Sequence, residues 1–522
     1  MFRSDFRAAQ PTGNVSQSSK PGRELSFAPT KVSQLFVVDV QTKVISQLTT
    51  DNAIYFNPDW SPDGAQIVCA SSEGRSLFGL GVGGSNIYTI DVATGRKHAL
   101  TTGTRDKRVP VWSPDGRWIA YSESEHFGPE SVFLVPGVGG KTTDVSASLD
   151  RGVIEFYWSA DSRSIVFNYM DGVSWSIARA EIPTGRITRL SNREASRWPL
   201  SVAGQDMMAW QQSDGAEQGV IRISAHSLGG PFVLLELNPQ MREWELGTQE
   251  VVRWRNRRGD ELEGFLIKPV GYIGGRKYPV IVNAYPQTTI GLYADPMSGG
   301  QLLAARGYAV FFPNSRSPAA WMNPFKSADF DLAVRGPNGL ALMLDDLNSG
   351  MDELIRRGVV DPDRMCLYGF SNGGAVVNQV VTMTDRFKCA VSVAAAVSTD
   401  WSLPFFLQSD ATFIAQIAGA TPWEDPESYM KLSAMYRLHK VNTPMLLADG
   451  DNDGLFLLST IEMYNGLRFL GKQVTFLRYP DQGHEFTGEA LKDFWGRENE
   501  FFDKYLKPKG SSATARELRE QP

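Results

Sequence analysis

The stretch Gly369-Phe-Ser-Asn-Gly-Gly374 decides the fold of the C-terminal half. It directly follows the apolar run Met365–Tyr368 and precedes a segment compatible with a helix. A G-x-S-x-G motif between a strand and a helix predicts a nucleophile elbow, a tight turn in which the serine backbone is strained and a Cβ on the flanking residues would collide with the strand and helix. Ser371 is therefore the predicted nucleophile. The N–H of Asn372, at the start of the helix, is the predicted oxyanion donor.

The segments around this motif predict a mostly parallel sheet with helices on both faces. Continuous apolar runs, which are typical of strands buried on both faces, alternate with segments of helical period. The apolar runs occupy 278–284, 308–312, 365–368, 390–397 and 445–448, and the helical segments 342–357, 375–384 and 458–470. The second half is therefore predicted to be an α/β domain.

In a fold of this kind the partners of the serine follow it in the order acid, then histidine. Of the five histidines, His98, His126 and His226 lie in the first half, and His439 precedes the best acid candidates. His484 follows a predicted strand on a short loop that contains glycine. By elimination His484 is the predicted general base.

The acid is expected after the strand 445–448, in Asp449-Gly-Asp-Asn-Asp-Gly454. Asp449, Asp451 and Asp453 all remain candidates on this argument. A calcium loop is the alternative interpretation, but the glutamate that such a loop needs at its twelfth position is missing. The acid would hold the imidazole tautomer and stabilise the imidazolium.

The first half repeats a different unit. Asn57-Pro-Asp-Trp-Ser-Pro-Asp-Gly64 returns almost unchanged as Val109-Pro-Val-Trp-Ser-Pro-Asp-Gly116 and, more loosely, as Glu155–Ser162. Each copy lies between short alternating strands, and a second hairpin follows it. A period of roughly 40–50 residues with two hairpins predicts the four-stranded blades of a β-propeller, whereas a β-sandwich of unrelated hairpins is the alternative. The phrases suggest four to five blades.

Composition sets further bounds. The chain has 522 residues, of which 42% are hydrophobic and 21% charged, with a net charge of −6. This balance favours a globular protein of two or three domains without general affinity for nucleic acid or an anionic membrane. We expect a loose arm over 1–30, a propeller over 31–240, the α/β domain over 241–508 and a disordered tail over 509–522. The N-terminus shows no secretory signal, so a cytoplasmic location is expected.

Three cysteines, Cys69, Cys366 and Cys389, stand far apart in the sequence, and we expect no disulfide framework. No metal-ligand spacing or phosphate-binding loop is present, so no cofactor is expected.

Together these motifs resemble the prolyl oligopeptidase family of serine peptidases, in which an N-terminal β-propeller caps an α/β-hydrolase domain. The resemblance covers about residues 30 to 506. It includes the segment Trp254–Gly264, which is similar to the family's entry strands, and Ser371-Asn372 followed by two glycines. The family's His-Gly-x-x-Asp pattern maps onto Asp449–Asp453 and thereby selects Asp453 as the acid. The resemblance also implies Tyr285 as the second oxyanion donor.

Several positions depart from the family pattern. The usual glycine pair of the oxyanion segment is absent, Asn314-Ser-Arg-Ser-Pro-Ala319 lacks the usual glycine, and Asp449 stands where the family has histidine. These changes surround the acyl pocket and spare the triad positions. The leading hypothesis is a serine hydrolase that cleaves small peptides through an acyl-enzyme. An esterase or amidase for a small non-peptide molecule, and a catalytically retired propeller binding protein, are the alternatives; the oligomeric state is left open.

Overall fold

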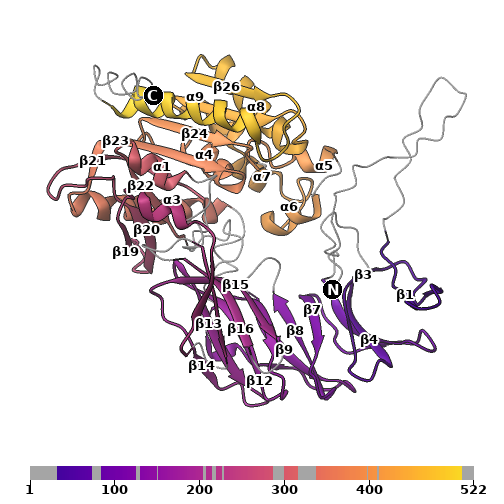
Figure 1. Cartoon of the computed structure of the whole chain (residues 1–522). Helices are drawn as coiled ribbons and strands as arrows, with labels where there is room; N and C mark the ends of the chain where they lie inside the picture. The colour runs from indigo at the N-terminus through magenta and orange to yellow at the C-terminus, as the bar shows by residue number, and fades with distance from the viewer. Residues whose placement is uncertain are drawn as a thin grey trace, which may run out of the picture.

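The computed structural model describes residues 32–72, 84–124, 130–149, 151–203, 207–213, 219–225, 229–285, 299–315, 337–396, 398–407 and 411–507. Two parts are visible in Figure 1. Small antiparallel sheets make up the N-terminal part, in the lower half of the view, and one large sheet flanked by helices makes up the C-terminal part above it.

The N-terminal part contains four sheets of four strands, each built from four consecutive antiparallel strands. They comprise β3 (Ile54–Trp60), β4 (Gln66–Ser72), β5 (Asn86–Asp91) and β6 (Lys97–Ala99); β7 (Asp106–Trp112), β8 (Trp118–Ser124), β9 (Ser131–Pro136) and β10 (Thr143–Asp144); β11 (Val153–Trp158), β12 (Ser164–Asp171), β13 (Ser174–Glu181) and β14 (Ile187–Arg189); and β15 (Ser196–Ala203), β16 (Met207–Ser213), β17 (Val220–Ala225) and β18 (Phe232–Glu236). A two-stranded sheet of β1 (Phe36–Val38) and β2 (Ile45–Gln47) precedes them. The described strands therefore form four complete blades and one partial sheet.

The repeated Trp-Ser-Pro-Asp-Gly phrase has a structural cause. In the first copy the Ser61 hydroxyl donates to Asp63 at 2.6 Å and accepts from the backbone N–H of Gln66 at 2.9 Å. Gly64 has a φ of +72°, which glycine adopts without steric cost. The same serine–aspartate hydrogen bond recurs at Ser113–Asp115 and Ser159–Asp161, both at 2.7 Å. The phrase thus forms a turn between the first two strands of a blade, and hydrogen bonds within the turn hold it.

The C-terminal part is an eight-stranded sheet in the order β19-β20-β22-β21-β23-β24-β25-β26. The pairs β19–β20 and β20–β22 are antiparallel, and the pairs from β22 to β26 are parallel. The strands are β19 (Gln249–Arg255), β20 (Glu261–Ile267), β21 (Tyr278–Asn283), β22 (Ala309–Pro313), β23 (Val360–Phe370), β24 (Cys389–Val393), β25 (Met445–Gly450) and β26 (Val474–Tyr479). The predicted α/β class with a mostly parallel sheet is confirmed.

Helices cover both faces of this sheet, as continuous apolar strands require. The helices are α1 (Gly300–Ala305), α3 (Pro337–Arg356), α4 (Asn372–Val380), α5 (Leu403–Leu407), α6 (Ala411–Ala418), α7 (Pro426–Leu432), α8 (Leu455–Phe469) and α9 (Gly488–Leu506). Buried side chains of α3, α4 and α8, such as Met351, Val377 and Met463, join one core cluster with the sheet. Those of α1 and α9, such as Leu303 and Phe502, join the cluster on the opposite face. Among the described residues, no helix is both long and apolar enough to cross a membrane.

A buried carboxylate connects the two parts. Glu263 on β20 accepts a hydrogen bond from the backbone N–H of Val173, in the turn between β12 and β13, at 2.7 Å. It also forms ion pairs with Arg193 of the propeller part and with Arg253 of its own sheet. A Cβ on Gly172 would lie 1.5 Å from the Glu263 carboxylate, so this turn requires glycine for the close approach. The contact fixes one blade against β20 of the large sheet.

The expectation of unpaired cysteines is wrong for two of the three. Cys366 on β23 and Cys389 on β24 are register partners with a Cα–Cα distance of 4.8 Å, and they are bonded as a disulfide. Sequence separation does not indicate whether two cysteines can pair, because neighbouring parallel strands bring together residues from distant segments. Cys69 is free and buried. The cytoplasmic location stays a prediction.

Glu498 on α9 provides a test of the packing on this face. Its side chain is buried, and its Oε1 atom makes no hydrogen bond to a described residue. Burial raises the pKa of Glu498 to about 8. The folded chain therefore binds a proton there between about pH 4, where a glutamate in an unfolded chain ionises, and about pH 8, and this group makes stability fall as pH rises through that window.

We therefore predict that Glu498→Gln gains unfolding free energy relative to the unsubstituted chain as pH rises from 5.5 to 7.5. The gain should be on the order of 1 kcal/mol per pH unit. Urea unfolding followed by tryptophan fluorescence at the two pH values measures it. Glu489→Gln, an exposed substitution on the same helix, is the control. Equal pH dependence in all three proteins would contradict the prediction.

Candidate active site

The site is built around the turn between β23 and α4. Ser371 has φ 57° and ψ −118°, a combination that L-residues rarely adopt. Its backbone is held from both sides: the Ser371 N–H donates to the carbonyl of Val393 at 2.8 Å, and its carbonyl accepts from Ala396 at 3.0 Å. These bonds tie the serine to the end of the neighbouring strand β24, which keeps the strained conformation in place.

The glycines around the serine are required by close backbone approach. A Cβ on Gly369 would lie 2.1 Å from the carbonyl oxygen of Gly373. A Cβ on Gly374 would lie 3.0 Å from both the Val393 carbonyl oxygen and the Cα of Ala395. The helix therefore starts directly above the two central strands. The sequence prediction of a strand–turn–helix at this position is confirmed.

The structure brings the three predicted residues into one hydrogen-bonded line. His484 Nε2 lies 2.9 Å from the Ser371 hydroxyl oxygen. His484 Nδ1 lies 3.0 Å and 2.9 Å from the two carboxylate oxygens of Asp453. The Asp453 side chain is 5% exposed and that of His484 is 33% exposed, so the acid is shielded while the imidazole edge faces the site. This is the geometry that a nucleophile, a base and an orienting acid require.

The loops that carry the acid and the base are joined by backbone hydrogen bonds. The N–H of Asp451 donates to the carbonyl of Tyr479 at 3.0 Å, and the N–H of Asn452 donates to that of Gln482 at 2.8 Å. A Cβ on Gly450 would lie 2.4 Å from the carbonyl oxygens of Gln482 and Gly483. The separation of Asp453 from His484 is therefore set by the main chain as well as by their own contact.

Each of the three competing aspartates has a different environment. Asp451 forms an ion pair with Arg478 of β26. Asp449 is fully buried; its Oδ2 accepts from the Thr460 hydroxyl of α8 at 2.7 Å and its Oδ1 from the N–H of Gly450 at 2.9 Å. Only Asp453 is hydrogen-bonded to His484.

Two aromatic rings flank the imidazole. The ring centroids of Phe370 and Phe456 lie 4.9 Å and 4.8 Å from that of His484. Phe370 ends β23, directly before the serine, and Phe456 lies in the first turn of α8. Sequence reasoning missed both. Phe370 had a signal, its place inside the G-x-S-x-G motif, whereas nothing in the sequence marked Phe456.

Both predicted oxyanion donors lie at the start of α4. Asn372 is the first residue of α4, and the first N–H groups of a helix have no acceptor within the helix. Tyr285 follows β21 and packs against the start of α4: a Cβ on Gly373 would lie 3.1 Å from its ring. The N–H of Tyr285 donates to the Asn283 side chain at 3.1 Å, which leaves the hydroxyl as its candidate donor. In the segment Asn314–Ala319, which differs from the family pattern, residues 316–319 lie outside the described residues.

Comparisons with known proteins agree with this architecture. Residues 297–509 match the model of the prolyl oligopeptidase family, and residues 19–230 match that of the TolB beta propeller domain. Dipeptidyl-peptidase 5 of Porphyromonas gingivalis is 25% identical, over 81% of this chain and 63% of its own length. An uncharacterized peptidase of Bacillus subtilis, YuxL, is 23% identical over 90% of this chain and 86% of its own length.

Solved structures share the fold. A puromycin hydrolase superposes with a TM-score of 0.74 at 16% identity, covering 89% of this chain and 72% of that chain. The Pyrococcus horikoshii acylaminoacyl peptidase has a TM-score of 0.72 at 19% identity, covering 93% and 76%. Fold and site thus define an α/β-hydrolase domain joined to a β-propeller. The chain therefore combines a prolyl oligopeptidase family domain over residues 297–509 with a TolB beta propeller domain over residues 19–230. It spans 63% of the length of the P. gingivalis relative.

The ionisation of Asp449 should affect the pH dependence of this site. Burial, joined by the hydrogen bond and charge of neighbouring Asp453, raises the pKa of Asp449 to about 8, although the bond from Thr460 opposes the shift. The Asp449 carboxyl is therefore neutral below about pH 8. Above that pH it places a second negative charge beside the acid that holds His484, and two buried carboxylates in one site repel each other.

We predict that the reactivity of Ser371 rises severalfold between pH 7 and pH 9, because roughly 90% of a group is ionised one unit above its pKa and the added negative charge stabilises the imidazolium that forms as Ser371 attacks. Asp449→Asn, which is neutral at every pH, should keep a flat profile across this range. Hydrolysis of a p-nitrophenyl ester measures the reactivity, with the rate of Ser371→Ala subtracted as background. Superimposable profiles would show that Asp449 does not titrate there.

Proposed function

We propose that this chain is a serine peptidase that cleaves small peptides by acyl transfer to water. The observation that carries the proposal is the continuous hydrogen-bonded line from Ser371 through His484 to Asp453, with contacts of 2.9–3.0 Å. It stands on a strained strand-to-helix turn that presents the serine at the carboxyl end of the sheet.

In the first half of the reaction the Ser371 hydroxyl attacks the peptide carbonyl. His484 Nε2, 2.9 Å away, takes the hydroxyl proton as the new C–O bond forms. The tetrahedral intermediate then collapses, the C–N bond breaks, and His484 returns the proton to the leaving amine. The acyl group remains as an ester on Ser371.

Water completes the cycle. His484 accepts a proton from the water that attacks the acyl carbonyl, and then protonates Ser371 as the carboxylic acid leaves. Asp453 holds the imidazole with Nδ1 protonated and Nε2 toward the serine, and it stabilises the imidazolium in both halves. Phe370 and Phe456 limit rotation of the ring by contact on either side. The proposed chemistry uses side chains and backbone groups alone.

The negative charge of the intermediate would be bound by the N–H of Asn372 and the hydroxyl of Tyr285. The backbone N–H has the helix N-terminus behind it, where the helix dipole favours an anion. For Tyr285 the support is its position beside Gly373 and the engagement of its own N–H with Asn283. Loss of one such donor costs about 10²–10³ in kcat in other serine hydrolases.

The substrate class rests on the relatives. They include dipeptidyl-peptidases, and one of the similar solved structures is an acylaminoacyl peptidase. We infer a similar preference for short peptides here, with release of a short N-terminal unit.

The test is a panel of p-nitroanilides: free dipeptidyl substrates, N-acetyl-aminoacyl substrates, and a p-nitrophenyl ester. We expect turnover of at least one peptide class, and a loss of about 10⁴-fold or more in kcat in Ser371→Ala. Ser349→Ala, on α3 away from the site, is the control and should retain activity. Turnover of the ester alone would favour an esterase or amidase for a non-peptide molecule. No turnover of any substrate by folded protein would contradict the proposal.

A further inference from the structure

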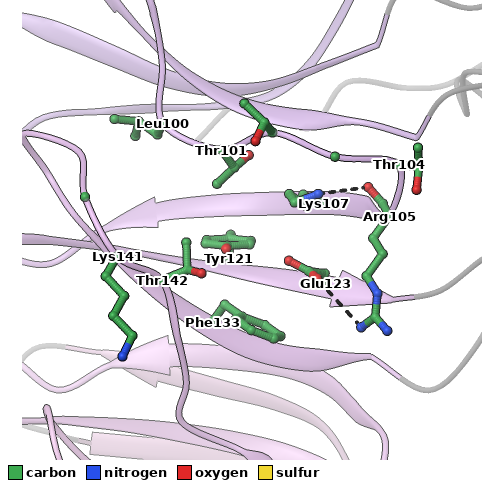
Figure 2. Close-up of a pocket in the computed structure, with 13 residues that line it drawn as sticks. Leu100, Thr101, Thr104, Arg105, Lys107, Tyr121, Glu123, Phe133, Lys141 and Thr142 are labelled. Carbon is green, nitrogen blue, oxygen red and sulfur yellow. Dashed lines mark hydrogen bonds and ion pairs between the residues drawn. The ribbon is translucent and has the colours of Figure 1, made fainter.

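A cavity lies in the propeller part, apart from the site around Ser371. It has a volume of about 460 Å³ and lies between the chain that links β6 to β7 and the blade β7–β10 (Figure 2). Such a volume falls in the range of small-molecule sites, about 300–1,000 Å³. The side chains that define its chemistry are Arg105, Lys107, Tyr121, Glu123, Phe133 and Lys141.

The cavity contains a buried ammonium group with little compensation. Lys107 is 4% exposed, and its Nζ donates to the backbone carbonyl of Arg105 at 3.2 Å (Figure 2). No carboxylate among the described residues lies within 4.0 Å of this nitrogen. Burial lowers the pKa of Lys107, while the charges of Glu123 and Asp106 oppose that shift and the charge of Arg105 adds to it. An ammonium taken out of water in this way lacks the anion that usually accompanies it.

A second buried donor lines the same cavity. Tyr121 is fully buried, and its ring stacks on that of Phe133 with a centroid distance of 5.8 Å and an interplanar angle of 24°. Its hydroxyl interacts with the Thr142 side chain, although the geometry falls short of a normal hydrogen bond. A buried hydroxyl with so weak a partner is only partly satisfied. An acceptor within the cavity would satisfy it.

The surrounding charges favour an anion. Among the described residues, three cationic side chains, Arg105, Lys107 and Lys141, line the cavity with one carboxylate, Glu123. Arg105 and Glu123 lie 3.8 Å apart, and the arginine is half exposed while the glutamate is largely buried. The cations therefore exceed the carboxylates by two, on a site with an aromatic wall.

We infer that this cavity binds a carboxylate group, with Lys107 and Tyr121 as the buried donors and Arg105 and Lys141 at the rim. The proposed peptidase activity, on which this inference rests in part, supplies one source: the free C-terminus of a small peptide. A small organic acid is the other source of the same chemistry. A carboxylate can accept hydrogen bonds from both buried donors, and it offsets the excess positive charge.

The position of the cavity suits a peptide. Lys107 and Glu123 are register partners near the start of β7 and the end of β8. In the next blade the corresponding end, where β12 leads into Val173, contacts Glu263 of the large sheet. The start of β7 and the end of β8, which carry the carboxylate site, therefore correspond to the end of the next blade that contacts the hydrolase domain.

Binding is tested by calorimetry with the full chain carrying Ser371→Ala, which prevents turnover. The probes are Ala-Ala-Ala, its C-terminal amide, and succinate. We expect the free acid to bind at least tenfold more tightly than the amide, the scale of a charge-assisted hydrogen bond of about 1.4 kcal/mol or more. Tighter binding of succinate than of the tripeptide would identify a small organic acid as the source.

Two substitutions of opposite expected sign identify the cavity as the site. Lys107→Met should weaken binding of the free acid about tenfold or more, whereas Glu123→Gln, which removes the competing carboxylate, should tighten it. Lys431→Met, on α7, is the control. Melting temperatures establish that each variant is folded. Equal binding of acid and amide, or unchanged binding in both Lys107→Met and Glu123→Gln, would overturn the inference.

The result is separable from the proposed function. The two claims have separate readouts: hydrolysis of a p-nitrophenyl ester by the unsubstituted chain tests the proposed function, and calorimetry with Ser371→Ala tests the carboxylate site. Carboxylate binding without any hydrolysis would overturn the peptidase proposal and leave this site standing. Hydrolysis without carboxylate binding would overturn the carboxylate site and leave the peptidase proposal standing.

Discussion

The strained backbone of Ser371 is the constraint on which the rest of the site depends. A serine at φ 57° and ψ −118° persists only where its surroundings hold it. Here the hold comes from hydrogen bonds to Val393 and Ala396 and from the close approach of Gly369 to Gly373. The strain places the hydroxyl above the sheet, within reach of His484. A side chain on either glycine would move the helix and with it the nucleophile.

The base and the acid reach the serine because parallel strands end at one edge of the sheet. β23 leads to Ser371, β25 to Asp453 and β26 to His484, so residues that are distant in sequence meet there. Backbone bonds between the acid and base loops then set their spacing. Positions fixed by main chain need no rearrangement during reaction, which is the condition for electrostatic preorganisation.

Much of this arrangement could be predicted from sequence, because the signals were local. The G-x-S-x-G turn identified Ser371, and chain order with few histidines identified His484. Selecting Asp453 needed the family pattern, since Asp449, Asp451 and Asp453 are alike in composition and differ only in their contacts. The neutral state of Asp449 depends on burial and on the distance to another carboxylate, which no spacing reports.

Other features were missed because they arise between distant segments. Phe456 reaches His484 across the site, and Glu263 meets Val173 across two parts of the chain. The disulfide depends on strand register rather than on sequence separation. The sequence does not distinguish Lys107 and Tyr121 from other strand residues. Only the structure shows that both are buried beside one cavity.

The most direct test of the central claim is the site of reaction with a fluorophosphonate. The purified chain would be labelled, digested and mapped by mass spectrometry, beside Ser371→Ala and His484→Ala. The account predicts one adduct, on Ser371, that is absent in Ser371→Ala and forms at least about a hundredfold more slowly in His484→Ala, because the hydroxyl then lacks its general base. An adduct on another residue, or no adduct on the folded chain, would contradict it.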